Sequence, residues 1–300
     1  MEYIKCILCN NNNNELFMEE NNYKAIKCKT CGLIYVNPRP TIEEIKKIYE
    51  SEASLTTNIN TFIKLKEKKL LIAKRDIRNI KKFKNHGRLL DIGSAAGYFL
   101  CTAKKIGYDC YGLEINKFLT QYSRDKLQLN VQCGTISDSN FPKSFFDIIY
   151  MRYVLSHLYN PVNELLKLNL YLKNNGLFIF ETGNAAELKA QYLKKMGGLG
   201  LPEHLFHFSR ENIIQLLAKT NFRLIKTIEY STHLRNKLYN AFGKKIRSSY
   251  SELKNAKSNK DISIKQKIFA RMDYALVMIS RILPKKNHWL SIIYISQKNK

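Results

Sequence analysis

The stretch RLLDIGSAAGYFL, residues 88–100, passes from an apolar run through an acid and small residues into an aromatic and apolar pair. This order predicts a buried strand, a tight turn and the first turn of a helix. Small residues in such a turn let a nucleotide approach the backbone closely. The stretch therefore predicts a nucleotide site at the carboxyl end of a strand.

Short apolar strands alternate with helical segments around this turn. The predicted strands are residues 88–92, 109–114, 129–133, 145–151, 176–181, 222–230 and 289–296. The predicted helices between them are residues 97–106, 116–127, 161–173 and 209–220. Such alternation indicates an α/β fold, in which a Rossmann-like, mostly parallel seven-stranded sheet carries helices on both faces.

Two acids narrow the choice of nucleotide. Asp91 ends the first of these strands, and Glu114 ends the next one, 23 residues later. A carboxylate in the second position can bond the ribose hydroxyls of an adenosine, which NAD and S-adenosylmethionine both contain. A dinucleotide fold uses three glycines to admit a pyrophosphate, whereas S-adenosylmethionine carries a sulfonium and an ammonium. An acid beside the turn therefore favours S-adenosylmethionine.

Two CxxC pairs stand near the N-terminus. Cys6 and Cys9 form the first, and Cys28 and Cys31 form the second after 18 intervening residues. This spacing is typical of a four-thiolate zinc site, in which each pair aims two sulfurs at one ion. Redox pairs and chance are the alternatives. The segment between the pairs is mostly polar, so we expect the metal to supply its folding free energy. The sequence leaves open whether the ribbon only stabilises the fold, binds a partner or covers the substrate.

The composition describes a folded but strongly basic chain. Its 300 residues are 45% hydrophobic, with a formal net charge of +25. Nucleic acid or an anionic membrane surface would suit that charge, and a Lys-, Asn- and Ile-rich composition is the alternative explanation. No apolar run approaches the about 18 residues of a transmembrane helix, and the N-terminal residues lack the apolar core of a signal peptide. We therefore expect a cytoplasmic protein, in which seven cysteines do not form a disulfide framework.

The sequence divides into four regions. The predicted divisions are a zinc ribbon at 1–40, linker helices at 41–85, an α/β domain at 86–231 and 287–300, and a basic helical insert at 232–286. Within the linker, Thr41 can cap a helix that begins IEEIKKIYES, and residues 60–84 have helical spacing.

The sequence of the insert predicts a basic amphipathic helix. Residues 231–300 hold 16 Lys and Arg against three acids. Within 262–283, one helical face carries Ile264, Ile268, Met272, Leu276, Ile279 and Leu283. Such a helix can cover a substrate pocket, lie peripherally at the inner membrane surface, or contact RNA, and the sequence leaves these three alternatives open. It does not indicate an oligomeric state.

The order of motifs resembles the class I S-adenosylmethionine-dependent methyltransferases. The stretches that carry the resemblance are LLDIGSAAGYFL, GLEIN, FDIIYMRYVLSHLYNPVNELLKLNLYLKNNGLFIFETGN and EHLFHFSRENIIQLLAKTNF. The segment CILC…CKTCGLIYVNPRPTIEEIKKIYE resembles the zinc-binding front end of many bacterial members. Together they cover about residues 1–230 and the last strand. Members often act on sugars, lipids or other small metabolites.

The resemblance implies a role for each matching residue. The turn would hold the methionine part of the cofactor, Glu114 its ribose, and Ile115 its adenine. Residues after the third and fourth strands would complete the site. The implied cofactor-binding set is Asp91, Gly93, Ser94, Ala95, Gly97, Glu114, Ile115, Thr135, Ile136, Met151 and Arg152.

Two positions depart from the family pattern. Ala95 stands where the family usually has a third glycine, and Ser156 precedes His157 where the family often has glutamate. An Asn/Asp-Pro-Pro-aromatic motif, which adenine-amine methyltransferases carry after the fourth strand, is replaced here by MRYVLSH. Methylation of an adenine amine is therefore disfavoured.

Candidate catalytic residues lie after the fourth and fifth strands. Gly197, Gly198 and Gly200 form a loop, which His204 and His207 follow just before a helix capped by Ser209. Histidine titrates near neutral pH and suits proton removal from a methyl acceptor. Packing and capping are the alternative roles of these histidines. Tyr153, just after the fourth strand, is a further candidate on the acceptor side.

Three functions fit these observations. The first is a methyltransferase for a small molecule, such as a sugar, lipid-linked glycan or related metabolite. The second is an RNA methyltransferase that binds RNA through its basic surface and zinc module. The third is a zinc adaptor on an inactive scaffold, against which the intact Asp91, Gly93, Gly97 and Glu114 set argues. The absence of a recognised RNA-binding module favours the small molecule over nucleic acid.

Overall fold

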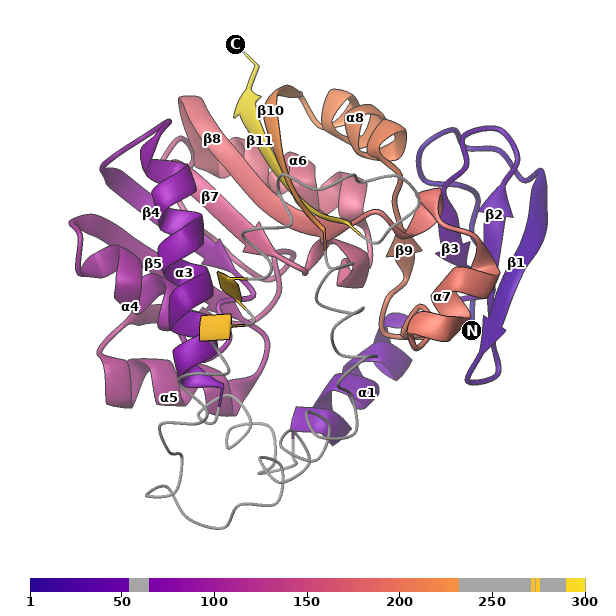
Figure 1. Cartoon of the computed structure of the whole chain (residues 1–300), viewed down its shortest axis with the longest axis horizontal. Coiled ribbons are helices and arrows are strands. Elements are labelled where there is room, and N and C mark those ends of the chain that lie inside the picture. The colour runs from indigo at the N-terminus through magenta and orange to yellow at the C-terminus, as the bar shows by residue number, and fades with distance from the viewer. Residues whose placement is uncertain (54–64, 232–270, 273, 276–289, 300) are drawn as a thin grey trace.

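A computed structural model describes residues 1–53, 65–231, 271–272, 274–275 and 290–299. Two sheets organise these residues, a large one in the α/β domain and a small one at the N-terminus (Figure 1).

The large sheet contains the seven predicted strands. They are β4 (Gly87–Ile92), β5 (Tyr108–Glu114), β6 (Asn130–Cys133), β7 (Phe146–Arg152), β8 (Leu172–Gly183), β10 (Phe222–Ser231) and β11 (Leu290–Lys298). Their order is β10-β11-β8-β7-β4-β5-β6. The pairs from β8 to β6 are parallel, and β11 is antiparallel to both of its neighbours. The predicted Rossmann-like, mostly parallel sheet is confirmed.

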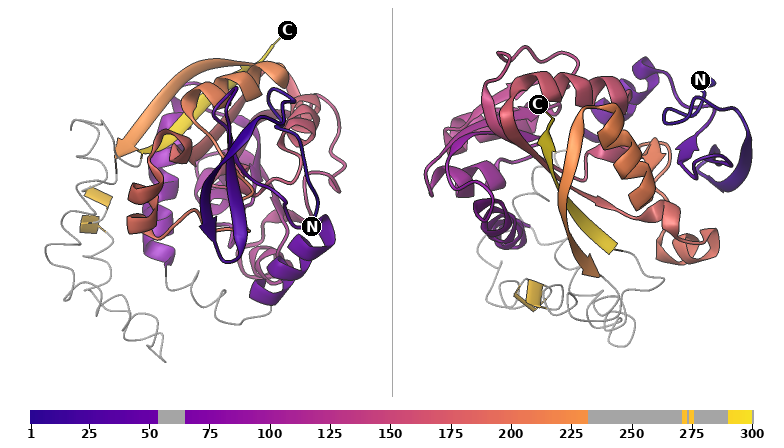
Figure 2. Two further views of the ribbon diagram at one scale, coloured as in Figure 1. Left: turned by 90° about the vertical axis from the view of Figure 1, so that its right-hand side faces the viewer. Right: turned by 90° about the horizontal axis from the view of Figure 1, so that it is seen from above.

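Helices cover both faces of this sheet (Figure 2). Leu89 faces a core with α3 (Lys66–Lys81) and α4 (Tyr98–Lys104). The next residue, Leu90, faces a second core with α6 (Pro161–Tyr171) and α8 (Arg210–Lys219). Helix α5 (Lys117–Leu127) lies beside α4, where Leu119 packs near Tyr98. Near-continuous apolar strands are expected for such a sheet, because both faces are buried.

The small sheet joins the N-terminal module to the α/β domain. It consists of β1 (Asn14–Glu20), β2 (Tyr23–Cys28), β3 (Ile34–Val36) and β9 (Phe206–His207), in that order and antiparallel. Strand β9 lies between β8 and α8 in the chain and pairs with β3 through Tyr35 and Phe206. The small sheet therefore crosses the boundary predicted at residue 40. One apolar core runs through both parts, from Met18 of β1 to Leu216 of α8.

Four further helices complete the described part of the chain outside the basic insert. The helix α1 (Ile42–Ala53) begins after Thr41, whose Oγ1 accepts from Glu44 N over 3.3 Å. The others are η1 (Leu155–His157), η2 (Ala185–Glu187) and α7 (Ala190–Met196). The sequence analysis does not predict α7, β9 or the strands β1–β3.

The basic insert at 232–286 lies outside the described residues apart from 271–272 and 274–275, which are helical. The proposed amphipathic helix at 262–283 is therefore described at only those four positions. Among the helices of the described chain, none is both long and apolar enough to cross a membrane.

Candidate active site and cysteine cluster

Two glycines give the turn between β4 and α4 its backbone conformation. Gly93 and Gly97 have φ values of 69° and 74°, in the left-handed region. A Cβ on Gly93 would lie 2.5 Å from Val154 Cγ2, and one on Gly97 would lie 2.5 Å from Leu129 Cδ1. Both positions therefore require glycine. Ala95, where the family usually has glycine, adopts a φ of 48°.

Glu114 joins the turn to the end of β5. Its Oε2 accepts from Ala95 N over 2.7 Å, and its Oε1 accepts from Asn116 N over 2.9 Å. Burial raises the pKa of Glu114, although backbone N–H groups of Asn116, Ala95 and Ile115 oppose the rise. Ile115, the residue expected to contact adenine, is 41% exposed. Glu114 thus supports the turn, and its predicted contact with a ribose stays a prediction.

Asp91 is a buried carboxyl beneath the same turn. Burial, followed by the neighbouring carboxyls of Glu114 and Asp76, raises its pKa well above the ordinary value, against the opposing effect of Arg152. Two buried acids with raised pKa values favour a cationic ligand, because a nearby positive charge offsets the cost of ionising them. Ser94 Oγ is also buried and has no hydrogen-bond partner among the described residues. These features fit S-adenosylmethionine, with its sulfonium and ammonium groups.

The loop after β6 lies beside Glu114. Gly134 N donates to the Glu114 carbonyl over 2.9 Å. Thr135 Oγ1 donates to Asp138 Oδ2 over 2.7 Å, and Ile136 is buried in the apolar core. The predicted contacts of Thr135 and Ile136 with the adenine ring stay predictions.

Arg152 belongs to a buried ion network. Its Nε donates to Glu181 Oε2 over 2.8 Å, and Arg75 reaches the same oxygen at 2.5 Å. Arg75 also bonds Asp76 Oδ1 at 2.6 Å, and Tyr150 donates to the other oxygen of Asp76 at 2.6 Å. Burial alone would raise the pKa of Glu181, but Arg152 and Arg75 lower it to about 2.

This network lies at the ends of β7 and β8, and no motif in the sequence points to it. An acid at the end of the fifth predicted strand, Glu181, was the available signal. Met151, the neighbour of Arg152, is fully buried in the core. The predicted contacts of Met151 and Arg152 with the methionine part of the cofactor stay predictions.

Tyr153 is connected to the ion network. Its hydroxyl donates to Ser291 Oγ over 2.6 Å, and Ser291 Oγ in turn donates to Glu181 Oε1. Tyr153 is 36% exposed and has a φ of 54°, so the chain turns sharply as it leaves β7. Its proposed catalytic role stays a prediction.

Three histidines form a cluster at η1, whose last residue is His157. The ring centroids of His157 and His204 lie 4.5 Å apart, and those of His204 and His207 lie 6.0 Å apart. Burial, followed by the charge of His204, lowers the pKa of His157 and of His207 to about 3. These two rings are therefore neutral near pH 7. The sequence analysis singled out His204 and His207 but not His157.

A contact path links the histidines to the turn after β4. Val154, which would clash with a Cβ on Gly93, immediately precedes η1. Within η1, the Ser156 carbonyl accepts from Leu205 N over 2.8 Å, beside His204. The candidate base and the cofactor turn are thus connected through one short segment.

His204 has a defined tautomer. Its Nδ1 lies 2.6 Å from the Leu199 carbonyl oxygen. A carbonyl only accepts hydrogen bonds, so Nδ1 carries the hydrogen. In the neutral ring the Nε2 atom then holds the lone pair, and only such a lone pair can take a proton.

The four cysteines of the two CxxC pairs converge at the N-terminal sheet. All four sulfurs lie within 4.8 Å of one another, and the Cys6–Cys31 and Cys9–Cys28 Sγ distances are 3.4 and 3.5 Å. A tetrahedral ion with Zn–S bonds of about 2.3 Å separates its sulfurs by about 3.8 Å. The cluster is therefore close to the size that a metal ion requires.

Each CxxC pair is followed by a residue with positive φ, Asn10 at 58° and Gly32 at 75°. The backbone turns back at both residues, since Asn10 N donates to the Cys6 carbonyl and Gly32 N donates to the Cys28 carbonyl. The two CxxC pairs therefore have the same backbone turn.

Comparison with known proteins identifies the class. A family model described as "Methyltransferase domain" matches residues 65–227, more than half of the chain, and the chain belongs to this family. No curated protein sequence matches it significantly.

Solved structures share the fold at low identity. The [4+2]-cyclase SpnF has a TM-score of 0.56 at 13% identity, with 87% of this chain and 98% of that chain covered. Phosphoethanolamine N-methyltransferase 2 of Haemonchus contortus, in complex with S-adenosylmethionine, has a TM-score of 0.52 at 13% identity, with 76% and 53% covered.

The family, the strand order and the two buried acids beside the turn, Asp91 and Glu114, together define a class I S-adenosylmethionine-dependent methyltransferase. The likeness to SpnF is one of fold alone, because that protein is described as a cyclase. The assignment of methyl transfer to this chain therefore rests on the family and on the site.

Proposed function

We propose that the protein methylates a small molecule, such as a sugar, a lipid-linked glycan or a related metabolite, with His204 as general base. The observation that carries this proposal is the hydrogen bond from His204 Nδ1 to the Leu199 carbonyl, which leaves Nε2 as the acceptor of a proton. His204 is also in contact with His157, one residue after Ser156 of the η1 segment.

S-adenosylmethionine supplies an electrophilic methyl carbon on its sulfonium. The chain would bind it through the turn at Gly93 and Gly97, while Glu114 accepts from its ribose hydroxyls and Asp91 compensates its positive charge. His204 Nε2 would take the proton from an acceptor hydroxyl or amine as the methyl group is transferred. Alignment of the acceptor with the sulfonium would also contribute to the rate of transfer.

The neutral state of His157 and His207 favours His204 over His207 as the base. With a pKa lowered to about 3, His207 binds a proton weakly at neutral pH. His207 is also part of the β3–β9 pair, where it lies opposite Ile34. We therefore assign His207 a structural part in positioning β9.

A bound zinc ion is the second part of the proposal. Four convergent thiols with a metal-sized spacing support it, because two buried and two half-buried sulfurs gain little by packing against one another without an ion. Since Asn212 Nδ2 donates to the Cys31 carbonyl over 2.7 Å, the ion would hold the module against the capping box of α8. Cys6, Cys9, Cys28 and Cys31 would be its ligands.

A small acceptor is favoured over RNA for two reasons. The described residues carry no recognised RNA-binding module. The phosphoethanolamine N-methyltransferase that shares the fold is named for a small-molecule substrate. Contact of the predicted basic helix at 262–283 with a membrane surface is part of the proposal, because lipid-linked glycans are found at membranes.

Methyl-labelled S-adenosylmethionine tests the acceptor class. The purified protein is incubated with label and with a fractionated lysate of its own host, and the labelled fraction is identified. Label in the small-molecule or lipid-glycan fraction is the expected result, and label that ribonuclease releases would establish the RNA alternative instead. In the same assay, His204→Ala should lower kcat by about 100-fold or more, whereas full activity would exclude His204 as the base.

A further inference from the structure

The hairpin formed by β1 and β2 is hydrogen-bonded to the glycine loop, residues 197–200, that precedes His204. Glu20 Oε2 accepts from Leu199 N over 2.6 Å, and Glu20 Oε1 accepts from Gly200 N over 3.0 Å. Beside them, Asn21 Nδ2 donates to the Leu201 carbonyl over 2.8 Å. The tip of the N-terminal module is therefore hydrogen-bonded to a segment about 180 residues away in the chain.

Glycine is required where the loop meets these groups. Gly198 has a φ of 93°, and a Cβ there would lie 2.3 Å from Glu20 Oε2. Gly200 has a φ of 77°, and a Cβ there would lie 2.8 Å from His204 Nδ1. By contrast, Gly197 has a φ of 107° with nothing within 4 Å of an added Cβ. The loop is thus shaped to receive a carboxylate on one side and an imidazole on the other.

One peptide group connects the carboxylate with the imidazole. The N–H of Gly200, which donates to Glu20, and the C=O of Leu199, which accepts from His204 Nδ1, belong to the same peptide bond. A negative charge on the N–H side polarises the peptide, which makes its carbonyl oxygen a stronger acceptor. Glu20 and His204 are therefore connected through a single amide group.

We propose that Glu20 is a positioning residue for His204, and that the N-terminal module takes part in methyl transfer through this peptide-bridged carboxylate–histidine pair. This inference rests on the proposed role of His204 as the base. The carboxylate fixes the Nδ1–H tautomer and the orientation of the ring. It also stabilises the positive charge that the ring gains when Nε2 takes a proton.

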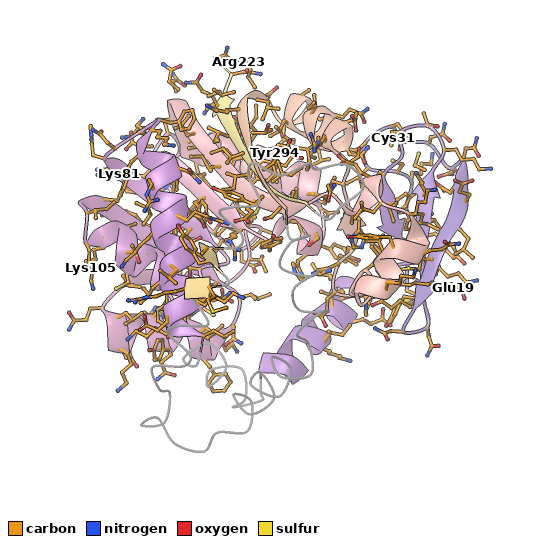
Figure 3. All side chains as sticks on the ribbon, viewed as in Figure 1. Glu19, Cys31, Lys81, Lys105, Arg223 and Tyr294 are labelled. Carbon is orange, nitrogen blue, oxygen red and sulfur yellow. The ribbon has the colours of Figure 1, made fainter. Side chains whose placement is uncertain are left out.

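The residues of the hairpin tip provide a matched control. Glu19 is the neighbour of Glu20 and pairs on the surface with Lys24, at 3.7 Å. Figure 3 shows Glu19 at the outer edge of the module. Glu19→Ala and Glu20→Ala thus remove the same charge from adjacent positions, but only the second removes the contact with the loop.

The first experiment reads the tautomer of His204 directly. Protein labelled with ¹⁵N-histidine contains six histidines, and His204→Gln assigns the His204 signal in a long-range ¹H–¹⁵N spectrum. We expect an Nδ1–H pattern in the unmodified protein and in Glu19→Ala, and a mixture of tautomers in Glu20→Ala. A single unchanged Nδ1–H pattern in Glu20→Ala would overturn the proposal, whatever the role of His204 in catalysis.

Gly198→Ala provides an independent disruption, in case Glu20→Ala alters the fold. The added methyl group displaces the carboxylate while Glu20 stays in the sequence, and Gly197→Ala adds the same methyl group in open space. Gly198→Ala should reproduce the mixed tautomer, and Gly197→Ala should not. If both keep the Nδ1–H pattern, the carboxylate does not control the ring.

Kinetics separates this proposal from the proposed function. In Glu20→Ala we expect kcat to fall about tenfold with KM for S-adenosylmethionine unchanged, and Glu20→Gln to recover part of the loss. If His204→Ala is fully active, the proposed base is wrong even where the tautomer shifts. If His204→Ala is inactive but Glu20→Ala is fully active, the base stands and Glu20 has no part in it.

Discussion

The backbone N–H of Ala95 donates to the carboxylate of Glu114 over 2.7 Å, so the acid that ends β5 supports the turn that follows β4. A glutamate expected to bind ribose therefore already has a structural partner on each oxygen. Each carboxylate oxygen has a second lone pair, and the same side chain can hold the turn and accept from a ligand.

Gly93→Ala should weaken binding of S-adenosylmethionine by about tenfold or more, because the new methyl group would meet Val154 at 2.5 Å. Isothermal titration calorimetry measures the change in Kd. Gly107→Ala is the control, since Gly107 also has a positive φ, 96°, but has nothing within 4 Å of an added Cβ. Equal losses of affinity in the two variants would mean that backbone strain, and not the close contact, sets the effect.

Binding of S-adenosylmethionine should weaken as the pH falls. The pKa values of Asp91 and Glu114 are raised in the free protein, and a cation binds better to the ionised acids. Affinity is therefore highest above the raised pKa values and declines as the pH falls through them. The Kd is measured at several values between about pH 8 and about pH 5. Asp91→Asn should show a weaker pH dependence, and an unchanged dependence in that variant would contradict a role for Asp91.

Removal of a cysteine ligand should destabilise the whole protein, because β3 pairs with β9 and Asn212 bonds the Cys31 carbonyl. Elemental analysis should find about one zinc ion per chain. Cys28→Ser should lose the ion and unfold at a lower temperature in differential scanning calorimetry. Cys101→Ser, on α4 and outside the cluster, should keep both properties. A separate small transition for the module alone would show that the shared sheet does not couple the two parts.

Glu181→Gln should lower the free energy of unfolding by about 3–5 kcal/mol, because it leaves the buried guanidinium of Arg75 and the partly buried one of Arg152 without full compensation. Chemical denaturation measures the change. Asp109→Asn breaks an exposed pair with Arg88, whose N–O distance is 3.6 Å, and should cost about 1 kcal/mol or less. A small loss in Glu181→Gln would indicate that the network relaxes around the missing charge.

The α/β sheet could be predicted from the sequence because its strands are short apolar runs that end in recognisable turns. All seven predicted strands are present, with ends that differ by a few residues. The cysteine cluster could also be predicted from the sequence, since a CxxC spacing brings two sulfurs close together. In both cases the information lies in residues close together in the chain.

The remaining features depend on distant residues. β9 is only two residues long, and its partner β3 precedes it by about 170 residues, so no local pattern identifies the pair. The contact of Glu20 with Leu199 and the contact of His157 with His204 also join residues that are far apart in the chain. Helix α7 was not predicted, and the three glycines predicted to form a loop follow it directly in the chain.

The position of β11 affects how the protein is made. This strand lies between β8 and β10, although both of them precede it in the chain. During synthesis on a ribosome, β8 and β10 therefore emerge with the space between them empty, and each exposes unpaired backbone groups there until residues 290–298 arrive. The nascent chain carries two open edges throughout that interval, and chaperones that shield such edges would act on it before translation ends.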